Sequence, residues 1–370
     1  MSITPFKLER YYSLYEFKAR VMLSSSDCES LSMAELLALA SPSSMELWNN
    51  LKLGYTETQG HPILRQEVSR SYAGILPEHL LIAAPEELIY IAMQSMLEPG
   101  DHVIALSPAY QSLYEVARSI GCSVSFWPLR IEGSRWVIDP DDLERLVTPH
   151  TRLLVLNFPN NPTGFVPSKT EFDAIVQFAR RHGLMVFSDE MYRLLEYHPE
   201  DRLSAICDVY EKGISLSGLS KTMALPGLRI GWLASQDTGL MERWLAFKDY
   251  TTICNSAPSE VLGIIAVQTR DRLVERNLSI ILDNLKIAAG FFDRLSSRFN
   301  WLPPSAGSIA FPAWLGQYPV EELCRRLVED HSVMLVPGSM FDHTGGHFRI
   351  GLGRRNFPQG MAALEMVLAE

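Results

Sequence analysis

The chain has few of the residues that build disulfide scaffolds or structural metal centres. Its 370 residues include five cysteines, which are odd in number and scattered, and no two of them form a Cys-x-x-Cys pair. Disulfide frameworks and structural zinc sites need paired or closely spaced cysteines, so neither is indicated. We expect ordinary core or surface roles for all five: Cys28, Cys122, Cys207, Cys254 and Cys324.

Long apolar runs and basic clusters are also missing. No uncharged stretch is long enough to cross a bilayer, and the N-terminus lacks an apolar segment followed by a small-residue cleavage site. The formal net charge is −10, from 33 Lys and Arg against 43 Asp and Glu, whereas nucleic acid backbones require a basic face. These absences argue against a membrane or nucleic acid partner and predict a cytoplasmic location.

The remaining composition, 47% hydrophobic and 21% charged, is that of an ordinary globular protein. A chain of this length buries a large core and forms about two domains. No repeat, low-complexity tract or Pro/Gly/Ser linker divides it cleanly. We therefore expect soft boundaries between an N-terminal segment (1–45) that packs with a small domain, a large domain (46–260), and a connecting helix with a small C-terminal domain (261–370).

Short apolar runs alternate with helical patterns from about residue 60 onward. Most of these runs are apolar on both faces, which is typical of strands in a sheet that is covered on both sides. Strands that alternate with helices predict a mainly parallel α/β sheet. The expected strands are His102–Ser107, Ser123–Trp127, Arg152–Phe158, Leu184–Ser188, Gly213–Ser217 and Arg229–Ala234.

Two helices between these strands have recognisable ends. Ser168 and Glu171 have the spacing of a capping box, and Gly183 lies just past the apolar face that follows them. Pro85 stands at a first helical position ahead of a second apolar face, which Pro99 closes. These signals place both helices between predicted strands.

The two ends of the chain differ from this middle part. Residues 1 to about 45 are expected to be irregular, apart from a short helix at Met33–Leu39. A long, interrupted helix is expected over residues 259–299. Beyond it, a strand near Ile309–Ala313 and a helix at Val320–Glu329 belong to a mixed pattern that is typical of a small α+β unit.

Polar residues follow four of the predicted strands, and each belongs to a different loop. Tyr110 follows one strand, Asn161 another, Asp189 with Tyr192 a third, and Lys221 a fourth. Because ligands bind outside the carboxyl ends of the strands in an open parallel sheet, we expect these loops to converge on one crevice. Taken singly each has an ordinary interpretation, since Asn-Pro-Thr-Gly has the composition of a turn and Asp189 could cap a helix.

Lys221 lies in a Ser-rich turn, and Arg229 follows eight residues later. A lysine amine becomes nucleophilic when burial or a nearby cation lowers its pKa, and it then forms Schiff bases with carbonyl compounds. Arg229 could supply that cation and also bind an anionic group close to the lysine. Most lysines near turns are solvated surface residues, so the rest of the chain decides the interpretation.

Five longer motifs contain these residues. They are Tyr-x-x-x-x-Gly-x-x-x-Leu-Arg at 55–65, Asn-x-Pro-x-Asn-Pro-Thr-Gly at 157–164, Asp-Glu-x-Tyr at 189–192, Ser-Lys-x-x-x-x-x-Gly-x-Arg-x-Gly at 220–231 and Phe-Arg-Ile-Gly at 348–351. As a set, they resemble the aminotransferase class I/II family of pyridoxal-phosphate enzymes. The resemblance implies the cofactor pyridoxal 5′-phosphate (PLP) and the type I fold, in which a large domain with a mostly parallel sheet binds PLP beside a smaller α+β domain.

The resemblance also implies a role for each loop residue. Lys221 would hold PLP as an aldimine and, once displaced, act as the base that moves the proton of the substrate. Asp189 would pair with the pyridinium nitrogen and keep it protonated. Asn161 and Tyr192 would hydrogen-bond the 3-oxygen of the ring, and Tyr110 would stack on the ring.

The resemblance also implies which residues bind the cofactor phosphate and the substrate carboxylate. Arg349 matches the arginine that binds the substrate α-carboxylate as a bidentate pair, with Asn161 as a second substrate contact. Tyr55 would reach the cofactor phosphate of a neighbouring subunit, which implies a homodimer with shared active sites. The phosphate would be held by Arg229, Ser220, Ser217 and the backbone of Ala84, Pro85 and Glu86.

Three features depart from the family pattern. Pro85 stands in the phosphate-binding turn but has no N–H to donate, so the amides of Glu86 and Glu87 would donate instead, and their side chains are expected to point away. Gly218 replaces the hydroxyl residue found three positions before the lysine in many members. The N-terminal loop expected over the substrate is Ser-rich here, at residues 24–29, which leaves the substrate open.

The leading interpretation is an aminotransferase that exchanges an amino group between an amino acid and a 2-oxo acid. The same site can also run elimination, decarboxylation or ring-closing replacement, and the Ser-rich loop with the Ala-Pro-Glu-Glu helix start is similar to an atypical branch, capreomycidine synthase. A non-enzymatic alternative is a PLP-binding regulatory protein. Regulators of that kind carry an added basic N-terminal module, which the acidic sequence does not indicate.

Overall fold

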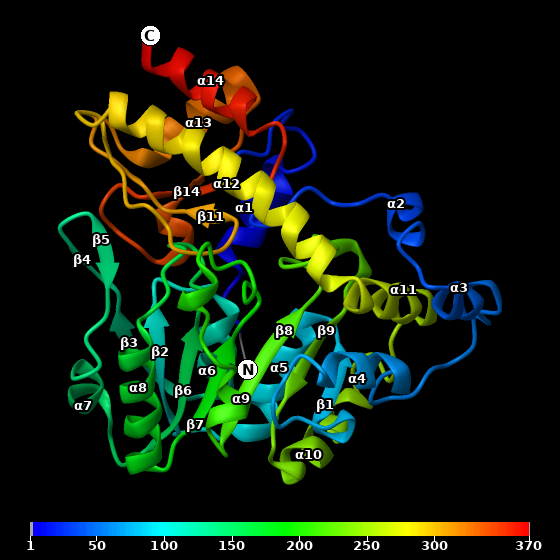
Figure 1. The fold of residues 1–370 in the computed structure, drawn as a ribbon. Coiled ribbons are helices and arrows are strands. Elements are labelled where there is room, and N and C mark those ends of the chain that lie inside the picture. The colour runs from blue at the N-terminus through cyan, green and yellow to red at the C-terminus, as the bar shows by residue number, and fades with distance from the viewer. Residues whose placement is uncertain (1–2, 370) are drawn as a thin grey trace.

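The computed structural model describes residues 3–369 and has a sheet of seven strands at its centre (Figure 1). The strand order is β1-β9-β8-β7-β6-β2-β3. Strand β9 is antiparallel to both of its neighbours, while the pairs from β8 to β3 are parallel, as predicted. The strands are β1 (Leu80–Ala83), β2 (His102–Ser107), β3 (Ser123–Pro128), β6 (Thr151–Asn157), β7 (Met185–Asp189), β8 (Gly213–Gly218) and β9 (Gly231–Ala234).

All six strands predicted for this region are present, with boundaries within two residues of those expected. Strand β1 is an additional strand that the sequence analysis missed. Its four residues form a short apolar run directly ahead of the helix at Pro85, and periodicity alone cannot separate such a run from the start of a helix. Pairing with β9 is a long-range contact, so only the folded chain reveals it.

Helices cover both faces of the sheet, which is the reason for its unbroken apolar strands. In β2, Val103 and Ala105 belong to the core that includes α5 and α6, whereas Ile104 and Leu106 belong to the core that includes α8. Alternate side chains of a strand point to opposite faces, so the arrangement is a three-layer α/β/α sandwich. The helices around the sheet are α5 (Pro85–Met96), α6 (Ser112–Ile120), α7 (Asp142–Leu146), α8 (Lys169–His182), α9 (Ile206–Val209) and α10 (Thr238–Lys248).

Local signals set the ends of α8 and α5 as predicted. The Ser168 side chain accepts a hydrogen bond from the Glu171 amide, and the Glu171 side chain accepts one from the Ser168 amide. Gly183 ends the helix in the left-handed conformation, with φ of 65°. Helix α5 begins at Pro85, so its first turn faces the carboxyl ends of the neighbouring parallel strands.

The C-terminal residues form a smaller α+β layer beside the sheet (Figure 1). The long predicted helix is interrupted at Thr269, which separates α11 from α12. The expected strand Ile309–Ala313 is wrong as a single strand, because Pro312 has no N–H for a ladder and two short strands form around it. Helix α11 (Ala257–Gln268) packs against α3 (Pro42–Asn49) instead of joining this layer. The elements that follow are α12 (Arg270–Arg294), β10 (Phe299–Asn300), β11 (Ile309–Ala310), β12 (Ala313–Trp314), α13 (Val320–His331), β13 (Val336–Pro337), β14 (Phe348–Gly351) and α14 (Phe357–Ala369).

The N-terminal segment is more ordered than the sequence suggested. It contains α1 (Lys7–Tyr15), α2 (Met33–Leu37) and α3 (Pro42–Asn49), so the expectation of a largely irregular segment is wrong. Helix α1 escaped prediction because its N-cap residue provides no side-chain hydrogen bond and tyrosines occupy much of its sequence. After α1 the backbone follows the C-terminal strands, where the Gly351 amide donates to the Leu23 carbonyl at 2.7 Å.

Within residues 3–369, no helix combines the length and the apolar character needed to cross a membrane. The remaining short elements are α4 (Pro62–Ser69), the hairpin of β4 (Arg130–Glu132) with β5 (Arg135–Val137), and the 3-10 turns η1 (Pro77–His79), η2 (Pro199–Asp201), η3 (Pro226–Leu228) and η4 (Gly338–Phe341).

Candidate active site

A cavity of about 410 Å³ lies where the carboxyl ends of the parallel strands meet α1 and the C-terminal layer. The loops after β2, β6, β7 and β8 all contribute to its wall, as the sequence analysis predicted. Ten of the predicted site residues line it: Pro85, Glu86, Tyr110, Asn161, Asp189, Tyr192, Ser220, Lys221, Arg229 and Arg349.

Three predicted site residues are not among those that line this cavity. Tyr55 is 93% exposed on a surface loop, and its predicted contact lies in a second subunit. Ala84 is the N-cap residue of α5, and Ser217 lies within β8, opposite Trp232 of β9. The roles of these three residues stay predictions.

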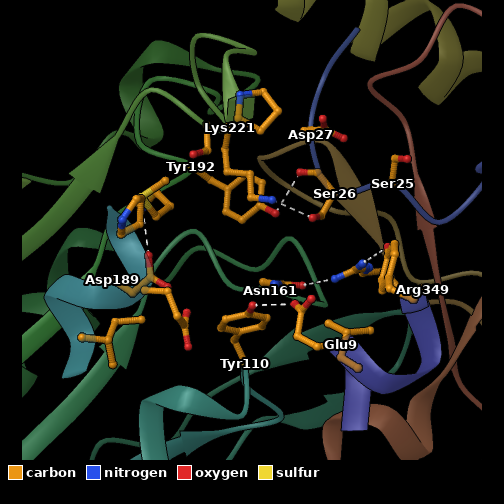
Figure 2. Close-up of a pocket in the computed structure, with 18 of the residues that line it drawn as sticks. Glu9, Ser25, Ser26, Asp27, Tyr110, Asn161, Asp189, Tyr192, Lys221 and Arg349 are labelled. Carbon is orange, nitrogen blue, oxygen red and sulfur yellow. Dashed lines mark hydrogen bonds between the residues drawn. The ribbon is translucent and has the colours of Figure 1, made fainter. Parts of the chain in front are cut away.

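Lys221 faces the N-terminal segment across the cavity (Figure 2). Its Nζ donates a hydrogen bond to Ser26 Oγ at 2.8 Å. Burial lowers the pKa of the amine, because the ammonium form loses its water. Asp27 acts in the opposite direction, while Arg349 and Arg229 lower the pKa further. The cationic influence that the sequence suggested for Arg229 alone is therefore shared with Arg349.

Asp189 lies at the end of β7 and is 7% exposed. Its Oδ1 accepts a hydrogen bond from the Met191 amide at 3.0 Å. Burial raises the pKa of the carboxyl group to about 6, while the amide bond and Lys221 partly offset this. A cation placed against Asp189 would favour its charged form, and a protonated pyridine nitrogen is such a cation.

Tyr192 and Asn161 come from different loops and border the same space (Figure 2). The Tyr192 hydroxyl donates to the Ser26 carbonyl at 3.0 Å, and burial raises the pKa of this phenol. Asn161 Oδ1 accepts from Arg349 Nη1 at 3.1 Å. Both side chains thus have one fixed hydrogen bond that holds them at the cavity wall.

Arg349 of β14 and Asp189 lie at opposite ends of this view of the cavity (Figure 2). The Arg349 guanidinium donates to the Tyr12 hydroxyl at 2.7 Å and to the Ser24 carbonyl at 3.1 Å. Its Nε has no hydrogen-bond partner, although the residue is only 1% exposed. A buried guanidinium with no carboxylate partner among residues 3–369 suits a carboxylate brought by a ligand.

Hydrogen-bond donors also gather near the start of α5. Ser220 is 5% exposed, and its Oγ has no partner. Arg229 has a left-handed backbone, with φ of 55°, and places its guanidinium in the cavity wall. The amides in the first turn of α5 add donors and a favourable helix dipole for an anion. These groups fit a phosphate.

The structure explains why glycine occupies position 218. A Cβ added to Gly218 would lie 2.9 Å from the Cα of Gly231 and 3.0 Å from the carbonyl oxygen of Ile230. The two glycines pair across β8 and β9. The close approach of these strands therefore excludes the hydroxyl side chain that the family pattern led us to expect.

The side chain of Glu86 lines the cavity, so the expectation that it points away is wrong. Glu87 does turn away, because its Oε1 accepts hydrogen bonds from Thr251 and Thr252 at 2.5 and 2.7 Å. Successive side chains of a helix are rotated by about 100°. The two glutamates therefore cannot both avoid the cavity once one is held by the threonines.

The sequence analysis expected the loop at residues 24–29 over the substrate, but it missed the residues near α1 that line the cavity. Glu9, Tyr12 and Glu16 line it from the region of α1, and their spacing of three and four residues was the available signal. Asp27 lines it from the segment that follows, where Arg354 Nη2 donates to both of its carboxylate oxygens at 2.8 and 2.9 Å.

Comparisons with known proteins agree with this geometry. A family model described as aminotransferase class I and II matches residues 23–356. Capreomycidine synthase from Streptomyces vinaceus is 31% identical over 366 residues, which cover 96% of this chain and 90% of the synthase. A PLP-dependent aminotransferase from Streptococcus suis 89-1591 superposes with a TM-score of 0.93 at 31% identity, covering 100% of this chain and 98% of that one. The PLP-dependent cyclase OrfR superposes with a TM-score of 0.91 at 27% identity, with the same coverage.

Proposed function

The chain belongs to the aminotransferase class I and II family and is a PLP-dependent aminotransferase, and we propose that its amino-acid substrate carries a cationic side chain. Further relatives also bear aminotransferase names. Enzymes of this class exchange an amino group between an amino acid and a 2-oxo acid. The observation that carries the proposal for the substrate is the acidic wall that the N-terminal segment adds to the cavity.

The donors and acceptors around the cavity fit PLP. Asp189 suits the pyridine nitrogen, and the unpartnered Oγ of Ser220, with Arg229, suits the phosphate. Tyr110 would stack on the ring, and Tyr192 with Asn161 would hydrogen-bond its 3-oxygen. When bound, the cofactor supplies an electrophilic carbonyl group and a ring that accepts electrons.

Lys221 has two tasks in this site. Its lowered amine pKa increases the fraction of the uncharged, nucleophilic form, which would hold the cofactor through its carbonyl group. As a free amine beside the bound substrate, Lys221 would accept the proton from the substrate's α carbon. Arg349, whose Nε has no hydrogen-bond partner, would bind the α-carboxylate, with Asn161 beside it, and would so fix which bond at that carbon faces the base.

The N-terminal segment contributes three carboxyl groups to the wall, those of Glu9, Glu16 and Asp27, and Asp27 is paired with Arg354. Glu9 accepts a hydrogen bond from the Tyr110 hydroxyl at 2.9 Å. The pKa of Glu16 is raised by burial and then by the negative charges of Glu9 and Asp27. Within residues 3–369, neither Glu9 nor Glu16 takes part in an ion pair. A cationic group on the substrate side chain would relieve this repulsion.

A panel of amino acids, each added without an oxo acid, tests both the reaction and the substrate. We expect stoichiometric conversion of the cofactor to its pyridoxamine form, read by absorbance, and fastest with lysine, ornithine or arginine. The double variant Glu9→Gln/Glu16→Gln should lower kcat/KM for these substrates by at least about tenfold. Leucine serves as the neutral control. Equal losses with leucine, or no preference for cationic substrates, would contradict the proposed substrate class.

A second candidate, a PLP-dependent cyclase or lyase, is favoured by the similarity to capreomycidine synthase along almost the whole chain. Both candidate functions would use the Lys221 amine, Asp189 at the pyridine nitrogen and Arg349 at the α-carboxylate. The same panel separates them, because an aminotransferase stops after one turnover without an oxo acid. Repeated turnover that releases ammonia or a cyclised product would favour the second candidate.

We also propose that the protein is a homodimer with shared sites and that it acts in the cytoplasm. Tyr55, 93% exposed, shares a surface loop with Leu53, which is 86% exposed, and neighbouring exposed apolar residues are typical of a contact surface. The five cysteines are all unpaired, as is usual in a reducing compartment. Light scattering that gives the mass of one chain would contradict the dimer.

A further inference from the structure

An acidic side chain lies in the part of the cavity wall where an anion is expected. Glu86 follows Pro85 in the first turn of α5 and lines the cavity together with Ser220 and Arg229. These are the residues whose donors fit the cofactor phosphate. An ionised carboxylate there would repel a phosphate dianion and compete with it for Arg229.

The neighbouring Glu87 shows that this orientation is particular to position 86. Glu87 belongs to the same helix turn and experiences the same helix dipole, yet its carboxylate is bound by Thr251 and Thr252 away from the cavity. An acidic residue at a helix N-terminus is common, and the dipole accounts for both glutamates. The dipole does not account for the position of Glu86 in the cavity wall.

Three charged groups and one phenol, all from other parts of the chain, lie near the Glu86 carboxyl group. Burial contributes most to raising its pKa, to about 7, and the negative charges of Glu9 and Asp189 add to it. A hydrogen bond with the Ser112 side chain, and then the positive charge of Arg229, act in the opposite direction. Tyr110 also lies close, since the charge of Glu86 helps to raise the pKa of that phenol. The protonated and ionised forms of Glu86 are therefore both accessible near neutral pH.

We propose that the side chain of Glu86 is part of the subsite for the cofactor phosphate and must carry a proton when the phosphate dianion is bound. The inference rests on the assignment of this cavity to PLP. The protonated carboxyl group donates a hydrogen bond to a phosphate oxygen, whereas the carboxylate cannot. The proton comes from solvent, one per site, whenever Glu86 is ionised before binding. PLP affinity therefore falls as the pH rises above the pKa of free Glu86.

The test is cofactor binding, measured without any turnover. Full-length protein freed of cofactor is titrated with PLP at about pH 6 and about pH 8.5, and tryptophan fluorescence gives the Kd of wild type, Glu86→Gln and Glu87→Gln. The ratio of the wild-type Kd to that of Glu86→Gln is expected to be close to one at the lower pH and about tenfold at the higher pH. Titration of the Lys221 amine affects every variant and cancels in the ratio.

Glu87→Gln is the matched control, because it removes a carboxylate from the same helix turn outside the cavity. Its ratio to wild type should not change with pH. Glu86→Ala should lose the pH dependence in the same way as Glu86→Gln, which separates the effect of the carboxyl group from any effect of the amide. A ratio for Glu86→Gln that stays constant across this pH range would overturn the proposal.

Pyridoxal, which lacks the phosphate, is the second probe. Wild type and Glu86→Gln should bind it equally at both pH values, and a gain as large as that seen with PLP would place the effect outside the phosphate subsite and overturn the proposal. Failure of wild type to bind either probe would contradict the cofactor assignment itself. Tight PLP binding with an unchanged ratio would overturn only the role of Glu86.

Discussion

Ser26 contacts the Lys221 amine directly and also accepts hydrogen bonds from two neighbouring side chains. Its Oγ accepts from Lys221 Nζ, while its carbonyl oxygen accepts from the hydroxyls of Tyr192 and Ser308 at 3.0 and 2.8 Å. The two carbonyl contacts fix the backbone, and the fixed backbone in turn fixes the position of Oγ. Ser26 is therefore placed to stabilise the charged form of the lysine after it has accepted a proton.

Ser26→Ala should lower kcat by about tenfold, with a smaller change in KM, because a hydrogen bond to a charged group contributes about 1.5–3 kcal/mol. Loss of this acceptor also lowers the pKa of Lys221 further, so the limb of the pH–rate profile set by the amine should move to lower pH. Ser26→Thr, which keeps the hydroxyl group, should restore both kcat and the position of the pH limb. A variant with an unchanged pH limb would show that Ser26 is only structural.

Lys221→Ala should abolish the covalent link to the cofactor. Borohydride reduction followed by mass spectrometry should add the mass of reduced cofactor to wild type and to Lys286→Ala, whose lysine is 78% exposed. The Lys221→Ala protein should bind PLP only reversibly. Retention of the added mass in that variant would contradict the assignment of the catalytic lysine.

At the level of elements, the segment from Ser24 to Asp27 is held in place by β14 and the turn after it. A Cβ added to Gly351 would lie 1.9 Å from the Ser25 carbonyl oxygen, and one added to Gly353 would lie 2.5 Å from the Asp27 carbonyl oxygen. Two glycines therefore allow the segment to approach closely enough for Ser26 to reach Lys221.

Gly351→Ala should displace this segment and lower kcat/KM by more than about tenfold, because a misplacement of about 1 Å at a site can cost two orders of magnitude. It should also lower the free energy of unfolding by about 1–3 kcal/mol through overpacking. Gly290→Ala in α12 is the control, since nothing lies within 4 Å of the added Cβ, and its helix should gain up to about 1 kcal/mol. Thermal unfolding and steady-state kinetics measure both effects. Normal activity in Gly351→Ala would show that the segment can shift without harm.

For the whole molecule, the buried carboxyl group of Asp189 is a source of instability without cofactor. Burial raises its pKa from 3.8 to about 6, so the folded state binds more protons than the unfolded state between these values. Stability must then fall as the pH rises through this window and stay reduced above it. The loss corresponds to roughly 2–3 kcal/mol.

Asp189→Asn should therefore be more stable than wild type above about pH 6 in the absence of PLP, and equal to it near pH 4. Denaturant unfolding at several pH values measures the difference. Asp173→Asn, an exposed position on α8, should show no such trend. A constant difference between Asp189→Asn and wild type at every pH would contradict the titration of Asp189.

The division of the whole chain stays a proposal. We propose an N-terminal segment (1–45) with the small C-terminal domain, a large domain (46–260) and a connecting helix with the C-terminal domain (261–370). The bridge between Val21 and Val333 and the hydrogen bond from Gly351 to Leu23 support the first pairing. Limited proteolysis that cuts near residue 260 before any other site would support the second boundary.

The sequence by itself determined the family, the cofactor and the parallel sheet. Lys221, Asp189, Asn161 and Arg349, which line one cavity, could be predicted as neighbours because each lies in a short motif whose spacing is local. The loops after parallel strands also meet at one edge of a sheet. The ends of α8 were equally accessible, because Ser168, Glu171 and Gly183 interact within one helix.

Only the tertiary structure decided which further side chains enter the cavity. Ser26 meets Lys221 across 195 residues of chain, and no local pattern contains such a contact. Glu86 and Glu87 are adjacent and chemically identical, yet one faces the cavity because Thr251 and Thr252 hold the other outside. Periodicity determines which residues share a face of a helix, but the direction in which that face points depends on what packs against it.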